Sequence, residues 1–255
     1  MKKFTKLASL LLAVLMVVLS FAACGGKEVT SDDAKVLKMA TNAEFPPFEY
    51  LENGEIVGAD VDIAYAIAEK LGMELEITNI DFDAALTGAA TGKYDMAVAG
   101  ITANDERRQN MNFSDNYYTA SQAIIVMADS DISTAADLEG KKVSCQEGTT
   151  GEQFILDGNY EVQSYKTGAE AIAALTAGKV DAVVIDDAVA RALSEKQEGK
   201  TVVLDEALTE EAYAIALELG DDELTEKING ALSELKAEGK LNEIFEKYDL
   251  PYDAE

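Results

Sequence analysis

The chain has 255 residues, which allows one large domain or two smaller ones, and 48% hydrophobic residues supply a core. Its 48 acidic residues outnumber 21 Lys and Arg, and the net charge of −27 argues against nucleic acid as a partner. No histidine is present, which excludes Ser-His-Asp and Cys-His catalysis, imidazole zinc sites and a histidine pH switch. We expect no catalytic residues, no metal and no cofactor.

Residues 1–23 have the features of an export signal. Lysines in the first few positions precede the apolar run 7–23, which ends in small residues and is rather short for a spanning helix. The sequence SFAAC, ending at Cys24, resembles the lipobox of bacterial lipoproteins, with Phe21 where leucine is usual. This resemblance implies cleavage before Cys24, a lipid on its thiol and attachment to the outer face of the cytoplasmic membrane. An ordinary signal peptide or an uncleaved anchor are the alternatives.

Residues 24–35 are small, polar and charged, which indicates a flexible tether. From Val36 onwards, strand and helix patterns alternate. Helix 59–71 carries an apolar stripe and ends at Gly72. The first half is expected to contain strands 36–40, 73–80 and 94–100, and helices 59–71, 82–91 and 104–110.

The same rhythm restarts near residue 121. We expect strands 121–127, 142–146, 162–165, 180–185, 202–204 and 212–217, a helical turn 135–138, and helices 148–156, 169–177, 187–198, 223–238 and 241–248. Alternating strands and helices predict an α/β protein with mostly parallel sheets flanked by helices. We expect lobe 1 to comprise 36–117 and 213–255 and lobe 2 to comprise 118–212. Crossings near 117–121 and 209–213 would join them, with a ligand bound between the lobes at the carboxyl ends of strands.

Two segments offer groups for an anion. Residues 148–151 (GTTG) follow a strand and open a helix, where free backbone amides favour a carboxylate, although a plain helix start fits them too. Arg107 follows the apolar strand that ends at Gly100, and its guanidinium suits a two-pronged carboxylate contact. A solvated arginine in a charged turn is the alternative.

Other residues suit the rest of an α-amino acid. Asp186 ends an apolar strand and suits an ammonium; the alternative is that Asp186 or Asp187 caps the following helix. Phe45 and Phe82 follow strands and offer aromatic walls, or they pack in the core. Cys145 lies in an apolar strand, where a thiol packs as a small hydrophobe. An anion clamp, an ammonium partner and aromatic walls at strand ends together predict a zwitterion site.

Four stretches in order resemble the family 3 extracellular solute-binding proteins of polar amino-acid ABC importers, which include glutamine- and histidine-binding proteins. They are ATNAEFPPFEYLENGEIVGADVDIAYAIAEKLG, GKYDMAVAGITANDERRQNMNFSDNYY, LEGKKVSCQEGTTGE and VDAVVIDDAVA. The resemblance spans residues 36–248. It implies a two-lobed periplasmic-binding-protein fold of type II with two crossover hinge strands, closing on its ligand. A membrane permease with its ATPase is the implied partner.

The resemblance also implies residue roles. Arg107 would bind the ligand's α-carboxylate, and Asp186 its α-ammonium. Gly100, Thr102 and Thr150 would add hydrogen bonds around these two groups. The ligand's side chain would lie between Phe45 and Phe82, and would be recognised by Asn42 and Gln146.

One departure from the family bears on the ligand. Asn42 stands where aspartate is common in relatives that bind basic amino acids or glutamine, so a cationic ligand loses a partner. Glu44 and Glu147 lie close in sequence and offer a substitute acidic wall. Because amides both donate and accept hydrogen bonds, we expect a neutral, glutamine-like side chain to be preferred over a basic one.

Two other functions compete with transport binding. One is an enzyme on the same scaffold, similar to cyclohexadienyl or arogenate dehydratases, which needs a general acid over the leaving group. Glu44 is the residue considered for that role. The other is a ligand-sensing module that docks on a receptor.

Overall fold

The computed structural model describes residues 35–252. The expected signal peptide, Cys24 and nearly all of the expected tether lie outside the described residues. No helix in the described part of the chain is both long enough and apolar enough to span a bilayer.

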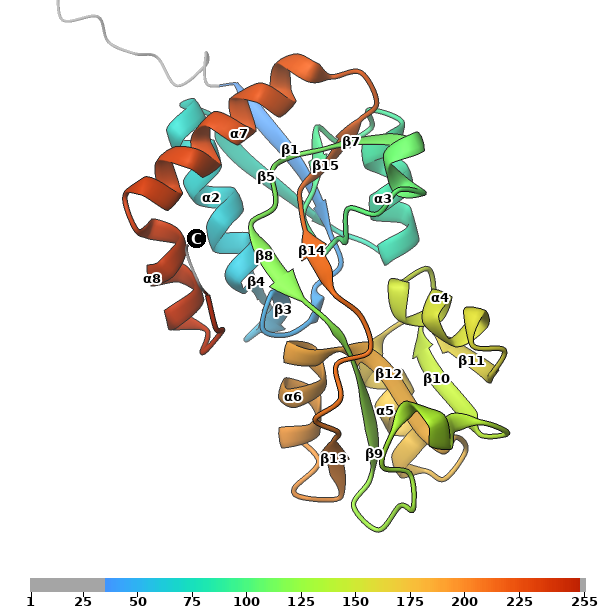
Figure 1. Ribbon diagram of the computed structural model, residues 1–255. Coiled ribbons are helices and arrows are strands. Elements are labelled where there is room, and N and C mark those ends of the chain that lie inside the picture. Colours follow the sequence, from blue (N-terminus) through green and yellow to red (C-terminus); the bar gives the residue numbers. More distant parts are fainter. Residues whose placement is uncertain (1–34, 253–255) are drawn as a thin grey trace, which may run out of the picture. The chain divides into compact units, whose positions relative to one another are not determined.

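The first sheet has five strands in the order β5-β1-β6-β15-β7 (Figure 1). β1 pairs in parallel with both β5 and β6, while β15 runs antiparallel between β6 and β7. We call this sheet and its helices lobe 1. Its strands are β1 (Val36–Thr41), β5 (Glu74–Asn79), β6 (Met96–Ala97), β7 (Met111–Phe113) and β15 (Ala216–Glu218).

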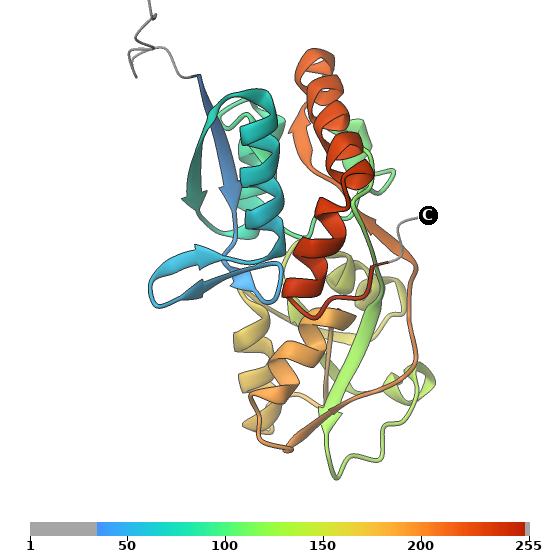
Figure 2. The same cartoon turned by 90° about the vertical axis from the view of Figure 1, so that its left-hand side faces the viewer.

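Helices cover both faces of this sheet. Alternation along β1 directs Leu37 and Met39 to one core cluster and Ala40 to another. The first cluster includes apolar residues of α2, α7 and α8, which Figure 2 shows side by side. The second is closed by α3. The helices are α2 (Ala59–Leu71), α3 (Phe82–Ala90), α7 (Asp222–Ala237) and α8 (Lys240–Lys247).

A small antiparallel sheet of three strands lies between β1 and α2, in a segment where no strand or helix was expected from the sequence. It ends at Gly58, and the first amides of α2 donate back to it, Ala59 to the oxygen of Pro47 at 3.1 Å and Asp60 to that of Phe48 at 2.9 Å. These two hydrogen bonds place the start of α2 beside the middle strand of the small sheet. The strands are β2 (Glu44–Phe45), β3 (Glu49–Glu52) and β4 (Glu55–Val57).

The second five-stranded sheet, in the order β11-β10-β12-β9-β13, has the same pattern. β10 pairs in parallel with β11 and β12, and β9 is antiparallel to β12 and β13. We call this sheet and its helices lobe 2. Its elements are β9 (Gln122–Met127), β10 (Lys142–Gln146), β11 (Glu161–Tyr165), β12 (Ala182–Asp186), β13 (Thr201–Val203), α4 (Thr150–Asp157), α5 (Gly168–Thr176), α6 (Asp187–Glu195) and the 3-10 turn η2 (Ala135–Leu138).

The chain crosses between the sheets in two neighbouring strands, β8 (Tyr118–Ala120) and β14 (Glu211–Tyr213). They pair antiparallel, with Tyr118 opposite Tyr213, and run side by side in Figure 1. These strands lie where the sequence predicted two crossings. Two five-stranded α/β sheets joined in this way form a two-lobed fold.

Three predicted elements differ in the structure. The strand expected over 94–100 is reduced to Met96–Ala97, because Gly100 adopts a left-handed φ of 54° and the chain turns out of the sheet. The strand expected over 212–217 is split into β14 and β15, since its first part pairs with β8 and its second with β6 and β7. The helix expected over 104–110 is a single 3-10 turn, η1 (Arg107–Gln109).

Candidate ligand-binding site

A cavity lies between the two lobes, at the carboxyl ends of β1, β6, β10 and β12. Every ligand-binding residue predicted from the sequence lines it, from both sheets: Asn42, Phe45, Phe82, Gly100, Thr102, Arg107, Gln146, Thr150 and Asp186. Three further residues line it: Thr149, which belongs to the predicted anion-binding segment 148–151, and Glu49 and Ala99, which were not predicted. Parallel strands present their carboxyl ends at one edge of a sheet, and two facing sheets therefore bring these distant residues together.

Arg107 is half-buried and held from several sides. Its backbone N–H donates to Asn104 Oδ1 at 2.9 Å, and its Nη1 donates to the oxygen of Thr102 at 2.9 Å. The guanidinium stacks over the ring of Phe82, 5.5 Å from its centre, and Nη2 reaches lobe 2 by donating to the oxygen of Gly148 at 3.1 Å. Burial lowers the pKa of Arg107, against the opposing effect of the carboxylate of Glu211. This arginine is therefore a fixed cation at the junction of the lobes.

The start of α4 faces the same point. Gly148 adopts a left-handed φ of 76°, and Thr149 caps the helix by accepting the N–H of Glu152 at 3.3 Å. Because Arg107 donates to Gly148, the positive end of the helix and the guanidinium lie together. A guanidinium beside a helix N-terminus is an arrangement that suits a carboxylate.

Asp186 supplies the opposite charge. It is 4% exposed, and its oxygens accept the hydroxyl of Tyr213 at 2.5 Å and Gln122 Nε2 at 2.9 Å. Burial, followed by the charge of Glu211, raises the pKa of Asp186 to about 7. Asp186 is the N-cap residue of α6, but its side chain makes no capping hydrogen bond to that helix. A buried carboxyl of this kind is stabilised in its charged form by a nearby cation.

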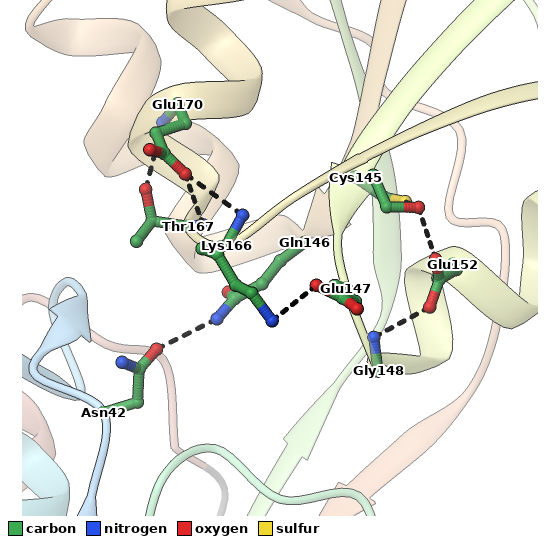
Figure 3. A network of polar contacts seen from close by, with 10 residues as sticks. Asn42, Cys145, Gln146, Glu147, Gly148, Glu152, Lys166, Thr167 and Glu170 are labelled. Atoms are coloured by element: carbon green, nitrogen blue, oxygen red, sulfur yellow. Dashed lines mark hydrogen bonds and ion pairs between the residues drawn. The ribbon is translucent and has the colours of Figure 1, made fainter. Parts of the chain in front are cut away.

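At the other end of the cavity, Asn42 and Gln146 contact each other across the cleft (Figure 3). Asn42 Nδ2 donates to the oxygen of Ile80 at 3.0 Å, and Gln146 Nε2 donates to Asn42 Oδ1 at 2.9 Å. Gln146 Oε1 is buried and has no hydrogen-bond partner among the described residues. Of these two amides, the open group is therefore an acceptor.

The acids that the sequence offered for this end of the cavity do not line it. The side chain of Glu147 forms an ion pair with Lys166 at 2.7 Å, which Figure 3 shows beside Gln146. Glu44 lies in β2, outside the lining set. Besides Asp186, the cavity is lined by another acid, Glu49, which follows the Phe-Pro-Pro-Phe segment.

Glu211 was also not predicted. It lies on the crossing strand β14, is 8% exposed and accepts the hydroxyls of Thr102 at 2.6 Å and Thr150 at 2.8 Å. Thr102 belongs to lobe 1 and Thr150 to lobe 2, so one carboxylate connects both halves of the site. Nothing in the local sequence signals this, because Glu211 and Thr102 are 109 positions apart.

Cys145 lies as expected in a buried strand, and it is a free cysteine. Burial raises the pKa of its thiol to about 12. Near it, Glu152 accepts the N–H of Gly148 at 2.7 Å (Figure 3). Glu152 also accepts the hydroxyl of Ser164. These contacts fix the loop that enters α4.

Two α/β lobes with a polar cavity between them define a two-lobed ligand-binding protein. The chain belongs to the bacterial extracellular solute-binding proteins, family 3, whose model matches residues 37–251.

Its relatives cover nearly the whole chain. The arginine-binding extracellular protein ArtP of Bacillus subtilis (strain 168) is 32% identical over 94% of this chain and 96% of its own length. The glutamine-binding ABC transporter protein GlnH of the same strain is 30% identical over 95% and 97%.

Solved structures are similar as well. An ancestral arginine-binding protein bound to glutamine matches with a TM-score of 0.80 and 41% identity, covering 84% of this chain and 97% of that one. The ancestral amino-acid-binding protein AncCDT-1, described as a precursor of cyclohexadienyl dehydratase, matches with a TM-score of 0.78 and 33% identity, covering 84% and 95%.

Proposed function

We propose that this protein binds a polar α-amino acid between its lobes and delivers it to the permease of an ABC importer. The observation that carries the proposal is the presence of Arg107 and Asp186, of opposite charge, in one cavity. Arg107 with the start of α4 would bind the α-carboxylate, and Asp186 the α-ammonium. Relatives named as arginine- and glutamine-binding proteins support an amino-acid ligand.

The remaining predicted residues would act around these two charges. Gly100, Thr102 and Thr150 would hydrogen-bond the main-chain groups of the ligand, and Phe45 and Phe82 would flank its side chain. Closure would occur about β8 and β14, with lobe 1 formed by 36–117 and 213–255 and lobe 2 by 118–212. Cleft closure of this kind removes the ligand from water and strengthens each charge contact.

For the side chain of the ligand, a neutral, glutamine-like amide is the first candidate. Its NH₂ group would donate to Gln146 Oε1, which has no partner within residues 35–252, while Asn42 keeps the donor of Gln146 aligned. A cationic side chain is the second candidate. It is favoured by the carboxyl of Glu49, which lines the cavity, accepts no hydrogen bond from the described part of the chain and would suit a donor-rich group.

A thermal-shift screen of the common amino acids tests the proposal, because a ligand that binds only the folded state raises the melting temperature by mass action. Competition titration of glutamine against arginine and lysine then ranks the side chains. Tighter binding of glutamine supports the first candidate, and tighter binding of arginine supports the second. A screen in which no α-amino acid shifts the melting temperature would overturn the proposed function.

We further propose attachment to the membrane through lipid on Cys24, on the basis of the lipobox resemblance. Cys24→Ala should release the protein into the medium or leave its precursor uncleaved. Cell fractionation with mass spectrometry of the N-terminus distinguishes these forms. A correctly trimmed Cys24→Ala protein that remains in the membrane fraction would exclude the anchor.

The proposed role requires no catalysis. Glu44, considered as a general acid for a dehydratase, does not line the cavity. Incubation with arogenate and prephenate, followed by mass spectrometry, should return both compounds unchanged. Conversion at an enzymatic rate would instead support the dehydratase alternative.

A further inference from the structure

Beneath the cavity lie two carboxyl groups that the proposed zwitterion contacts do not use. Glu49 in β3 is 1% exposed, and Asp60 in α2 is fully buried. Asp60 Oδ2 accepts the N–H of Gly100 at 2.8 Å and the hydroxyl of Tyr117 at 2.9 Å. Both oxygens of Glu49 and the Oδ1 of Asp60 have no hydrogen-bond partner in the described part of the chain.

The backbone oxygen of Phe48, the residue before Glu49, accepts the N–H of Asp60 at 2.9 Å, so the two acids lie on adjacent segments. An ionised carboxylate can only accept hydrogen bonds, so two adjacent buried carboxylates leave their adjoining oxygens unsatisfied. One proton placed between Glu49 and Asp60 Oδ1 removes this deficit, since the protonated carboxyl donates to the ionised one. Among the described residues, none of the ion pairs involves either group. In the described part of the chain, therefore, no Lys or Arg side chain pairs with Glu49 or Asp60 and allows both carboxyls to ionise.

The electrostatic surroundings favour the same state. Burial and then the charge of Asp60 raise the pKa of Glu49 well above its ordinary value, and the charge of Asp186 adds to this. Burial raises the pKa of Asp60 to about 6, against the hydrogen bonds from Gly100 and Tyr117. The charged groups that act on Glu49 are both acids, Asp60 in α2 and Asp186 at the end of β12. The phenol of Tyr117, just before β8, donates to Asp60.

Glu49 also lines the ligand cavity, together with the unpartnered Oε1 of Gln146. We propose that Glu49 and Asp60 hold one proton between them, that a ligand with a cationic side chain displaces this proton, and that the pair thereby sets the selectivity between neutral and cationic amino acids. With the proton, the wall is a neutral hydrogen-bonding surface suited to an amide. Without it, the wall is an anion suited to a guanidinium or ammonium. The proposal rests on the proposed function.

Calorimetry in buffers of different ionisation enthalpy measures the protons released on binding. Asp186 complicates a single measurement, because any α-ammonium favours its ionised form and releases its proton near pH 7. Glutamine serves as the control, since it shares that contribution but carries no side-chain charge. We expect arginine to release about one proton more than glutamine, and the arginine-to-glutamine affinity ratio to rise about tenfold per pH unit below the pKa of the pair.

Glu49→Gln keeps a hydrogen-bond donor toward Asp60 but removes the exchangeable proton. In this variant we expect the extra proton release with arginine to vanish, so that arginine and glutamine release equal numbers of protons. Equal proton release for both ligands in the wild type, or an affinity ratio that does not change between pH 5 and pH 9, would overturn the proposal. Arginine failing to bind at every pH while glutamine binds would also overturn it.

A measurement without ligand separates this idea from the proposed function. A protonated carboxyl has an infrared C=O stretch distinct from that of a carboxylate. Because Asp186, with a pKa of about 7, contributes to such a band at neutral pH, the test uses the ligand-free Asp186→Asn variant. The band should remain in Asp186→Asn and disappear when Glu49→Gln is added to it. If the band is present and no amino acid binds, the proposed function has failed but the shared proton stands. If the band is absent, the shared proton is wrong, whatever the ligand.

Discussion

Single residues in the cavity are held mainly by protein partners. Arg107 is fixed by Thr102 and Gly148, and Asp186 by Tyr213 and Gln122. Holding side chains in place before the ligand arrives reduces the entropy lost on binding. Affinity is therefore expected to depend on a few fixed charges.

Removal of either charge is expected to weaken binding strongly. Arg107→Ala and Asp186→Ala should each lose at least about 2 kcal/mol of binding free energy, because truncation leaves a buried ligand charge unpaired. Isothermal titration calorimetry measures this directly. Arg108→Ala and Asp187→Ala are matched controls, since each neighbours a site residue in sequence without lining the cavity. If a site variant binds the ligand within a few-fold of wild type, the substituted residue does not contribute to binding as proposed.

The raised pKa of Asp186 also predicts how stability changes with pH. A carboxyl whose pKa is about 7 when folded and near 3.8 when unfolded holds its proton more tightly in the folded state. Its contribution to stability is complete below about pH 4 and is lost as pH rises toward 7, at about 1.4 kcal/mol per pKa unit.

Ligand-free protein should accordingly show a loss of stability over that range, which denaturant unfolding at a series of pH values measures. Asp186→Asn should flatten this part of the profile. Asp187→Asn, which removes a partly buried ion-pair partner of Arg191 outside the cavity lining, should leave it unchanged. If stability changes with pH at the same slope in Asp186→Asn and in wild type, folding does not raise the pKa of Asp186.

At the scale of elements, the junction between β4 and α2 sets how α2 packs against β3, the strand that contains Glu49. Gly58 adopts a φ of 135°, and a Cβ at this position would lie 2.0 Å from the oxygen of Phe48. The same oxygen accepts the N–H of Asp60, which brings α2 against β3. Only glycine permits this approach of two backbones.

Gly58→Ala is therefore expected to cost more than about 2 kcal/mol of folding free energy, from the combination of an unfavourable φ and a clash with fixed backbone. Gly54→Ala in the same small sheet is the control, because Gly54 also has a positive φ of 88° but no atom near its Cβ. Equilibrium unfolding in urea compares the two. Equal losses would show that the backbone conformation alone matters at Gly58.

The sequence predicted elements well where one local pattern dominates. The apolar stripe of α2 and its stop at Gly72 are found as expected, with Ile63 and Ile67 fully buried. The small sheet β2-β3-β4 was missed because Pro46 and Pro47 interrupt any alternation and β2 has only two residues. Its strands exist through pairing with each other, which no single segment reveals.

The candidate site divides in the same way. The strand and helix pattern, together with the resemblance to a family, selected nine residues that all line one cavity, whereas their roles in binding stay predictions. The importance of Glu49 depends on Asp60, which lies in another element, and that of Glu211 on threonines from both lobes. Such contacts join segments that are far apart in the sequence, so the spacing of residues within one segment does not predict them.

At the scale of the whole molecule, the dominant feature is its charge. A net charge of −27 produces self-repulsion that opposes the compact state and that salt screens over about 10 Å at 0.1 M. The unfolding midpoint at pH 7 should therefore rise between 10 mM and 0.5 M NaCl, as measured by calorimetric scanning.

The same salt series near pH 4.5 is the control. The sequence pI is about 4.2, so the net charge is small there and little repulsion remains to be screened. A salt effect of the same size at both pH values would attribute the stabilisation to general exclusion of salt from the surface.

The position of β15 in the first sheet affects when that sheet becomes complete. Ala216 pairs with both Ala97 and Phe113, so β15 is the central link between β6 and β7. The second sheet, in contrast, draws all its strands from the continuous segment 122–203. During synthesis, all the strands of lobe 2 emerge before β15, the strand that pairs with the free edge of β6. A nascent chain therefore cannot finish lobe 1, or the cavity at its edge, until the residues beyond Ala216 have emerged.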